Sequence, residues 1–323
     1  MSDLTQAKRV IALGFFDGVH LGHAALLKRV VEAARALGAV PAAVTFDRHP
    51  EDVIFGTKRV PLITSPSDRA ELMNRLFGIQ EIIEAHFDRR MMQMPWESFV
   101  EDFLVREHGA VHLVAGHDFH FGYKGEGNPE RLKQKCARLG IGCDIIPKVE
   151  LDGITISSTY IRSLLAQGEM ERACRFLGHP YTLTAPVGHG RHLGSALGFP
   201  TVNLAFPAEV MFPALGVYAT RVWVLPVCPD NHEPPGPRHL PGEGPYLSVT
   251  NVGVRPTVED GGQVNAEGFL LDFDGDLYGR VLRLEFYRFL RPERKFAALD
   301  ELRAEVLRNA EQTRAYFKEA PHA

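Results

Sequence analysis

The hydrophobic pattern of this chain changes once along its length, and this change constrains the fold more than any other feature. Before Gly178, short apolar runs such as Arg9–Phe16 and Ala39–Phe46 alternate with segments of helical spacing such as His23–Leu37. The same patterns predict strands at Glu81–Glu84, Val111–Ala115 and Cys143–Ile146, and helices beginning at Ser65-Pro66, Trp96 and Pro129. This alternation predicts right-handed βαβ crossovers and a parallel sheet. Because such sheets bind ligands beyond the carboxyl ends of their strands, we expect a site at that edge.

After Gly178 the pattern is that of strands separated by Gly/Pro turns. The expected strands are Val217–Leu225, Tyr246–Val252, Phe269–Phe273 and Val281–Phe289, followed by a helix at Phe296–Phe317. Such a run is typical of an antiparallel β-barrel or sandwich with a terminal helix, and we expect the β-barrel. We therefore expect two domains, 1–182 and 183–323, and a proline-rich hairpin loop at Pro226–Pro245 in the second.

Composition narrows the classes of function. The 323 residues include 36 basic and 40 acidic side chains, and the net charge of -4 argues against a dedicated nucleic-acid binder. The four cysteines form no CxxC pair, which is typical of reduced thiols. The chain shows no secretory signal and no apolar run of the ~20 residues that a membrane helix needs. We expect a cytoplasmic protein that binds neither nucleic acid nor a membrane.

The segment GFFDGVHLGH lies at the first strand-to-helix junction. Its histidines, His20 and His23, are three residues apart at the start of a helix, so both can converge on one phosphate. The first helical amides and the positive end of the helix dipole add to the attraction for an anion. Gly14, Gly18 and Gly22 let the backbone approach a nucleotide closely. The alternative, a pair of histidines in a glycine-rich turn, is less favoured at this position.

A second phosphate-type element is the segment ISSTYIR, Ile156–Arg162. Ser158 and Thr159 open a helix, and Arg162 lies one turn in, where its guanidinium can bind phosphate oxygens in a forked geometry. Taken alone, the segment is more typical of an ordinary helix cap with a surface arginine.

Together these segments resemble the HxGH and ISSTxIR signatures of the nucleotidyltransferase superfamily, and the chain is most similar to the prokaryotic bifunctional riboflavin kinase/FAD synthetase family. The resemblance spans about residues 8–318. Its further motifs are TFDRHP (45–50), GHDFHFG (116–122), GHGR (188–191), LGFPTVN (197–203), NVGVRPT (251–257) and DLYG (276–279). It implies a Rossmann-like nucleotidyltransferase domain that adenylylates FMN to FAD with release of pyrophosphate, and a barrel that phosphorylates riboflavin to FMN. ATP is the co-substrate of both reactions.

The resemblance assigns roles in the first reaction. His20 and His23 would stabilise the α-phosphoryl group in the transition state, while Arg162, Ser158 and Thr159 would hold the outer phosphates. The other expected nucleotide-binding residues are Gly14, Phe16, Asp17, Gly22 and Asp118, and His49 would contact substrate. The FMN phosphate is already anionic at neutral pH, so this reaction needs orientation and charge compensation more than a protein base.

For the kinase reaction the resemblance implies Glu267 as the base, although a strand carboxylate facing solvent is the plain alternative. Thr201 and Asn203 would bind Mg²⁺, and strand alternation puts both on one face. Asn203 would also contact substrate, and Arg291 would lie near the flavin. Expected ATP-binding residues of the barrel are Gly188, Gly190 and Arg191.

Three positions depart from the family pattern. Tyr160 replaces an arginine, Glu126 lies in a loop that is usually more basic, and Gly268-Phe269 replaces Thr-His. The first two reduce positive charge, so one alternative is a riboflavin kinase with a weakened adenylyltransferase domain. A non-catalytic flavin-binding module is the other, and the retained histidines, glutamate and metal ligands count against it.

Overall fold

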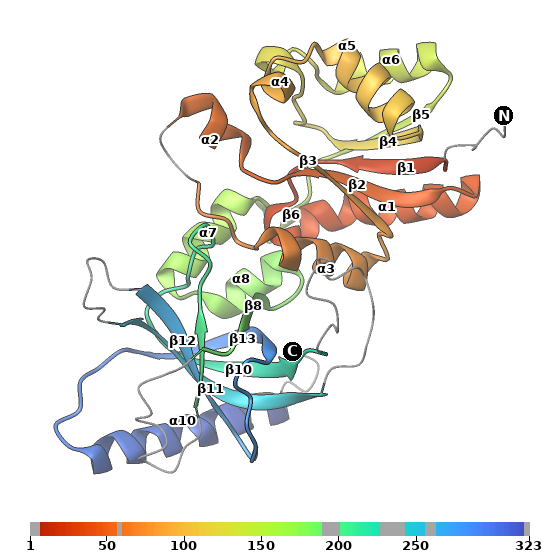
Figure 1. Ribbon diagram of the computed structural model, residues 1–323. Helices are drawn as coiled ribbons and strands as arrows, with labels where there is room; N and C mark the ends of the chain where they lie inside the picture. The colour runs from red at the N-terminus through yellow and green to blue at the C-terminus, as the bar shows by residue number, and fades with distance from the viewer. Residues whose placement is uncertain (1–6, 57–59, 189–200, 227–242, 256–262, 320–323) are drawn as a thin grey trace. The chain divides into compact units, whose positions relative to one another are not determined.

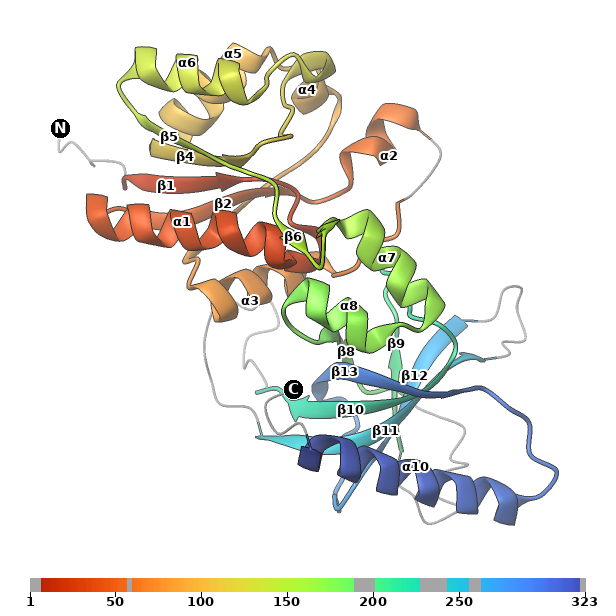
Figure 2. The same ribbon diagram turned by 180° about the vertical axis from the view of Figure 1, so that it is seen from behind.

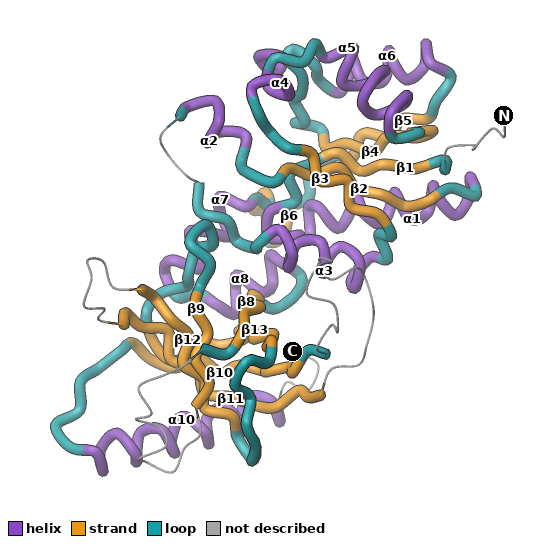
Figure 3. The backbone as a smooth tube through the Cα atoms, viewed as in Figure 1, coloured by secondary structure: helices purple, strands orange, loops and turns teal. Residues whose placement is uncertain are grey.

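The computed structural model describes residues 7–56, 60–188, 201–226, 243–255 and 263–319. It divides into two compact units: residues 1–61 with 69–157, and residues 62–68 with 158–323. Figure 3 shows the helices and strands of each unit along the chain. We describe each unit by itself.

A five-stranded parallel sheet forms the centre of the first unit (Figure 1). Its strand order is β3-β2-β1-β4-β5. The bounds are β1 Arg9–Leu13, β2 Val40–Phe46, β3 Glu81–Ala85, β4 Ala110–Gly116 and β5 Gly142–Ile146. All four pairings are parallel, as the alternating pattern predicts. The strand order reverses between β1 and β4, and α/β sheets bind ligands at such a switch point.

Apolar layers cover both faces of this sheet. The helices of the unit are α1 Leu21–Leu37, α2 Pro50–Phe55, α3 Pro66–Phe77, α4 Arg89–Met92, α5 Trp96–Ser98, the π-helix η2 Phe99–Glu107 and α6 Pro129–Leu139; the short 3-10 turns are η1 Asp17–Val19 and η3 Tyr123–Gly125. On one face, Val10 and Ala12 pack with apolar side chains of α1 and α3. On the other, Ile11 and Leu13 pack with those of η2 and α6. A two-stranded hairpin, β6 Glu150–Leu151 and β7 Ile154–Thr155, follows the sheet.

The predicted helix boundaries of this unit have visible causes. The Asn128 side chain accepts a hydrogen bond from the Arg131 amide at 3.0 Å, and Gly140 ends α6 with a left-handed φ of 70°. Ser65 caps α3 in the same way, since its hydroxyl accepts from the Asp68 amide at 3.0 Å. These helices are confirmed, whereas the one predicted from Trp96 is a short α-helix continued by a π-helix.

A six-stranded antiparallel sheet with order β8-β13-β10-β11-β12-β9 forms the second unit. The bounds are β8 Tyr181–Pro186, β9 Thr201–Ala205, β10 Gly216–Val224, β11 Glu243–Arg255, β12 Gln263–Leu270 and β13 Val281–Pro292. A bridge between Gly188, just after β8, and Asn203 on β9 joins the two edges, so the sheet closes. The helices are α7 Ser158–Gln167, α8 Met170–Leu177 and α10 Leu299–Glu319, the last lying along the sheet (Figure 2). The predicted fold class is confirmed.

The strand predicted at Phe269–Phe273 is wrong in its bounds. The strand β12 ends at Leu270, because Leu271 and Asp272 form a turn in which Asp272 has a left-handed φ of 59°. The loop predicted at Pro226–Pro245 is also too long, since β11 begins at Glu243. Residues 227–242 of that loop lie outside the described residues.

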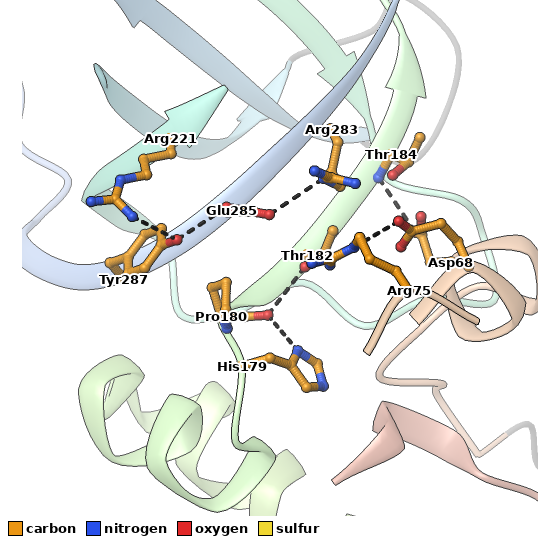
Figure 4. A network of polar contacts seen from close by, with 11 residues as sticks. Asp68, Arg75, His179, Pro180, Thr182, Thr184, Arg221, Arg283, Glu285 and Tyr287 are labelled. Atoms are coloured by element: carbon orange, nitrogen blue, oxygen red, sulfur yellow. Dashed lines mark hydrogen bonds and ion pairs between the residues drawn. The ribbon is translucent and has the colours of Figure 1, made fainter. Parts of the chain in front are cut away.

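A polar network crosses the outer face of the barrel (Figure 4). The buried Glu285 accepts a hydrogen bond from the Tyr287 hydroxyl at 3.0 Å and pairs with Arg283 at 3.3 Å. Arg221 on β10 donates to the same hydroxyl at 3.4 Å. Arg283, Glu285 and Tyr287 lie on β13, and the Arg221 contact joins β13 to its neighbour β10. We assign the network to the barrel's stability. Among the described residues, no helix has the length and apolarity needed to cross a membrane.

Candidate active sites

The chain between β1 and α1 makes a turn with unusual backbone conformations. Phe16 and Val19 have left-handed φ values of 58° and 43°, and Gly18 lies between them at 77°. A β-branched residue such as Val19 rarely adopts this conformation, and strain of this kind clusters at functional sites. The turn ends at His20, which is the N-cap residue immediately before α1.

His20 caps the helix that it precedes. Its Nδ1 accepts a hydrogen bond from the His23 amide at 3.3 Å, and the two imidazole rings stack with centroids 3.6 Å apart. An Nδ1 that accepts a hydrogen bond carries no proton, so neutral His20 has its proton on Nε2 and can donate there. Gly22 makes this placement possible, because a Cβ at this position would lie 3.0 Å from His20 Cε1.

The surroundings of His23 favour the neutral ring. Burial lowers its pKa well below the ordinary value, and the nearby His20 and Arg69 lower it further. Within the described part of the chain, His23 Nδ1 is buried without a hydrogen-bond partner. The ring of Phe16 meets that of His23 edge-on at 5.2 Å. The histidine pair is therefore suited to donate hydrogen bonds as neutral rings to a developing negative charge.

Other predicted residues of the first unit cluster around this turn. Phe16 and Asp17 are buried, and a Cβ on Gly14 would lie 3.0 Å from the Phe16 ring. His49 caps α2 and its ring meets that of Phe15 edge-on at 4.9 Å, so it lies beside the turn. Asp118 follows β4, next to β1 in the sheet, and its carboxylate is largely exposed, 3.9 Å from His117 Nδ1.

The ISSTYIR segment is divided between the two units. Ile156 belongs to the first, where its carbonyl oxygen would lie 3.7 Å from a Cβ on Gly22. Ser158, Thr159 and Arg162 lie on α7 in the second unit. The segment therefore begins against the N-terminus of α1.

Two of the three departures from the family pattern, Tyr160 and Glu126, occupy different surroundings. Tyr160 packs edge-on against Phe176 at 4.9 Å, and the Arg172 guanidinium lies 5.7 Å from its ring. Tyr160 thus contributes to the packing of α7 on α8. Glu126 is exposed, and its backbone oxygen accepts a hydrogen bond from Arg131 at 2.5 Å.

In the second unit, strand register brings the predicted kinase residues into one row. Glu267 on β12 lies directly opposite Asn203 on β9 and Asn251 on β11. Asn251 lies opposite Val217, which in turn lies opposite Arg291 on β13. Directly opposed residues project from the same face of a sheet. Five strands therefore present one row of side chains with Glu267 between two asparagines.

Thr201 and Glu267 are in direct contact. The Thr201 hydroxyl donates to Glu267 Oε1 at 3.1 Å, which requires a carboxylate oxygen with a lone pair available. Thr201, Asn203 and Glu267 are all half-buried. Their oxygen atoms are hard ligands of the type that Mg²⁺ prefers, and their small number leaves room for water and phosphate oxygens. Among the described residues, no group of three or more His, Cys, Asp or Glu side chains is placed to hold a metal ion.

Arg291 ends the row under α10. Its Nε pairs with the buried Glu305 at 3.2 Å and donates to Asn309 Oδ1 at 3.1 Å. Burial lowers the pKa of Arg291, and the charge of Glu305 opposes this shift. Glu305 also pairs with Arg294 at 2.9 Å and Arg308 at 3.4 Å, so one buried carboxylate pairs with three arginines.

Of the predicted ATP-binding residues in the barrel, only Gly188 is described. Its amide donates to the Asn203 carbonyl at 2.9 Å, which places the start of the GHGR loop beside β9. Gly190 and Arg191 lie outside the described residues.

Three residues that contact these sites, Asn251, Glu305 and Arg69, are not identified as site residues by the sequence analysis. Asn251 was noted only within a motif, and its position opposite Glu267 depends on strand register. Glu305 reads as an ordinary helix carboxylate. Arg69 had a usable signal, since it is three and four residues before the buried Leu72 and Met73 on α3, so a charge lies on the buried face of a helix.

Known proteins resemble the chain along nearly its whole length. Residues 2–160 match the family described as FAD synthetase, and residues 177–317 match the family described as riboflavin kinase. Curated proteins named bifunctional riboflavin kinase/FMN adenylyltransferase are similar: that of Listeria monocytogenes is 35% identical, covering 97% of this chain and 94% of the relative. The Escherichia coli K12 protein is 33% identical, covering 98% and 95%. A crystal structure titled as a macrolide-efflux protein from Streptococcus pneumoniae superposes with a TM-score of 0.80 at 27% identity, covering 96% and 95%.

Proposed function

The chain belongs to the bifunctional riboflavin kinase/FMN adenylyltransferase family, and from this premise we propose how its two groups of residues share two transfers. The enzyme is a transferase that phosphorylates riboflavin to FMN and adenylylates FMN to FAD, with ATP as donor in both reactions. We assign adenylyl transfer to residues 1–182 and phosphorylation to residues 183–323. The matched family ranges support this division. The compact units divide elsewhere, because α7 and α8 cluster with the barrel.

In adenylyl transfer, a phosphate oxygen of FMN attacks the α-phosphorus of ATP. A new P–O–P link forms and the bond to the β-phosphate breaks, which releases pyrophosphate. His20 donates from Nε2 to the α-phosphoryl oxygens, since its Nδ1 is occupied by the His23 amide. His23, kept neutral by burial and the neighbouring positive charge, adds a second ring at the same point. Ser158, Thr159 and Arg162 hold the outer phosphates.

The nucleotide contacts of this reaction are assigned from the same turn. Gly14, Phe16, Asp17 and Gly22 shape the surface that the nucleotide approaches, and Asp118 lies at the end of the neighbouring strand. His49 contacts the substrate. Because Phe16 and Asp17 are buried, we infer that they stabilise the turn between β1 and α1.

In phosphorylation, Glu267 accepts the proton of the ribityl 5′-hydroxyl as the hydroxyl oxygen attacks the γ-phosphorus of ATP. The bond from the γ-phosphorus to the β,γ-bridging oxygen breaks, and ADP leaves. Thr201 and Asn203 would hold Mg²⁺, which would compensate charge on the phosphates. Arg291 binds the flavin side, and Gly188, Gly190 and Arg191 contribute to the ATP loop. The observation that carries this proposal is the row in which Glu267 lies between Asn203 and Asn251.

Two further proposals concern the setting of the enzyme. Its partners are the small molecules riboflavin, FMN and ATP, and neither nucleic acid nor membrane takes part. We place the reactions in the cytoplasm, which the three free cysteines among the described residues support.

The test is to incubate the protein with riboflavin and MgATP and to separate the flavins by chromatography. We expect FMN followed by FAD. Glu267→Gln should lower FMN formation by 10²- to 10⁴-fold, the usual range for loss of a general base, and leave conversion of FMN to FAD intact. His23→Ala should do the reverse. Accumulation of FMN without FAD in the wild type would favour a kinase with a weakened first domain, and flavin binding without product would favour a binding module.

A further inference from the structure

Arg69 on α3 lies beside the HxGH turn and is only 1% exposed. Its Nη1 donates to the Phe15 carbonyl at 3.0 Å, and its Nη2 donates to the Phe46 carbonyl at 2.8 Å. The guanidinium also lies over the Phe15 ring, 4.6 Å from its centroid. One buried cation thus joins the turn after β1 to the last residue of β2, at the carboxyl edge of the sheet.

The two carbonyls belong to the two motifs that surround the first site. Phe15 lies within GFFDGVHLGH, and Phe46 lies within TFDRHP. The Thr45 hydroxyl donates to the same Phe15 carbonyl at 2.9 Å, so this oxygen is held from two sides. A planar guanidinium can reach both carbonyls at once in a fixed geometry, whereas a lysine ammonium presents a single point charge.

The surroundings of Arg69 indicate a role other than stability. Burial lowers its pKa, and the negative charges of Asp17, Glu84 and Asp47 oppose this shift. Its Nε is buried without a hydrogen-bond partner in the described part of the chain. A buried charge with an unsatisfied donor is a costly way to hold two loops, and such costs are typical of functional sites.

We propose that Arg69 is a positioning residue for FMN adenylylation, which holds the turns after β1 and β2 so that His20 and His23 meet the α-phosphate. Because the side chain is buried, it acts through the turns and does not touch the substrate. The inference rests on the adenylyltransferase activity proposed above.

The decisive variant is Arg69→Lys, which keeps the positive charge and removes the planar guanidinium that donates to both carbonyls. We expect kcat for FAD formation from FMN to fall 10- to 100-fold, because small misplacement of catalytic groups has effects of this size. The KM values for FMN and ATP should change less than threefold. Arg106→Lys is the matched control, since Arg106 is an exposed arginine of the same unit that pairs with Asp102 and Glu101. It should retain the wild-type kcat.

The pKa of His23 is a second measurement, which separates the positioning role of Arg69 from the effect of its charge. The titratable and charged groups next to His23 are His20 and Arg69, and both lower its pKa. Arg69→Met removes one of these charges and should raise the pKa of His23, measured by NMR of the imidazole Cε1–H signal. Arg69→Lys should leave that pKa near the wild-type value while kcat still falls. A residue that only supports packing would not produce this split, because its substitution would lower kcat only as far as the first unit unfolds. The upward pKa shift in Arg69→Met reports the loss of the charge beside His23.

Folding is followed in the same samples by Trp96 fluorescence in a Trp223→Phe background, because Trp96 packs on Phe121 in the first unit. Retained fluorescence and riboflavin kinase activity with reduced kcat support the proposal. An Arg69→Lys enzyme with the kcat of Arg106→Lys overturns it, and so does a loss explained by unfolding of the first unit. A wild type that makes FMN but no FAD overturns the proposed adenylyl transfer instead, so the two failures are distinct.

Discussion

The two sites are built from different parts of the backbone. In the first unit, His20 and His23 are placed by a single strained turn between β1 and α1, within ten consecutive residues. In the second, Asn203, Glu267 and Arg291 come from three different strands and meet through β-sheet register. The first site is therefore sensitive to local backbone and side-chain volume, and the second to contacts between distant segments.

The largest effect that would sharpen this comparison is expected from Gly22→Ala. A Cβ at this position would lie 3.0 Å from His20 Cε1 and 3.1 Å from Nδ1, so the ring must move. Displacement of a catalytic group by a fraction of an ångström should lower kcat for FAD formation about 10- to 100-fold. The higher helix propensity of alanine stabilises α1, whereas the close contact with the His20 ring destabilises it. Because the two contributions oppose each other, the free energy of unfolding should change by less than ~1 kcal/mol.

Chromatographic assays of both reactions check this prediction in one sample. FMN formation should stay at the wild-type rate, because the kinase residues lie on the strands of the second unit. If Gly22→Ala forms FAD at the wild-type rate, the placement of His20 does not depend on the local backbone and the comparison fails.

This difference also explains what sequence alone can predict. The fold class and helix boundaries follow from periodicity and local caps such as Ser65 and Asn128, and the motif at His20 is contiguous. The end of β12 was misplaced because the left-handed conformation of Asp272 is not a property of residue type alone. Asn251 opposite Glu267 and Glu305 beside Arg291 depend on register and helix docking, which pair residues far apart in the chain.

The second site should respond to a change on α10. Glu305→Gln removes the charge that Arg291, Arg294 and Arg308 share, so the guanidinium of Arg291 loses its fixed orientation. We expect KM for riboflavin to rise several-fold, and the free energy of unfolding to fall by about 1–3 kcal/mol, the usual cost of leaving buried polar groups unsatisfied. Steady-state kinetics and urea unfolding measure the two effects.

The matched control is Glu311→Gln, an exposed carboxylate of the same helix. It should change neither KM nor stability appreciably, since exposed charges contribute little. An unchanged riboflavin KM in Glu305→Gln would show that Arg291 is not held for the flavin, and the row on the sheet would then end at Val217.

The smallest effect is expected at Tyr160. This residue replaces an arginine of the family pattern, and the replacement is one reason for the alternative hypothesis of a weakened adenylyltransferase domain. Its ring packs on Phe176 and lies under Arg172, so the residue contributes to packing within the second unit. Tyr160→Arg should lower the free energy of unfolding by roughly 0.5–1.5 kcal/mol, the value of an aromatic pair, and change FAD formation less than threefold. Tyr160→Phe keeps the ring and should match the wild type in both measurements. A rise in FAD formation above tenfold in Tyr160→Arg would contradict this expectation and show that charge at this position, and not the geometry of the turn after β1, limits adenylyl transfer.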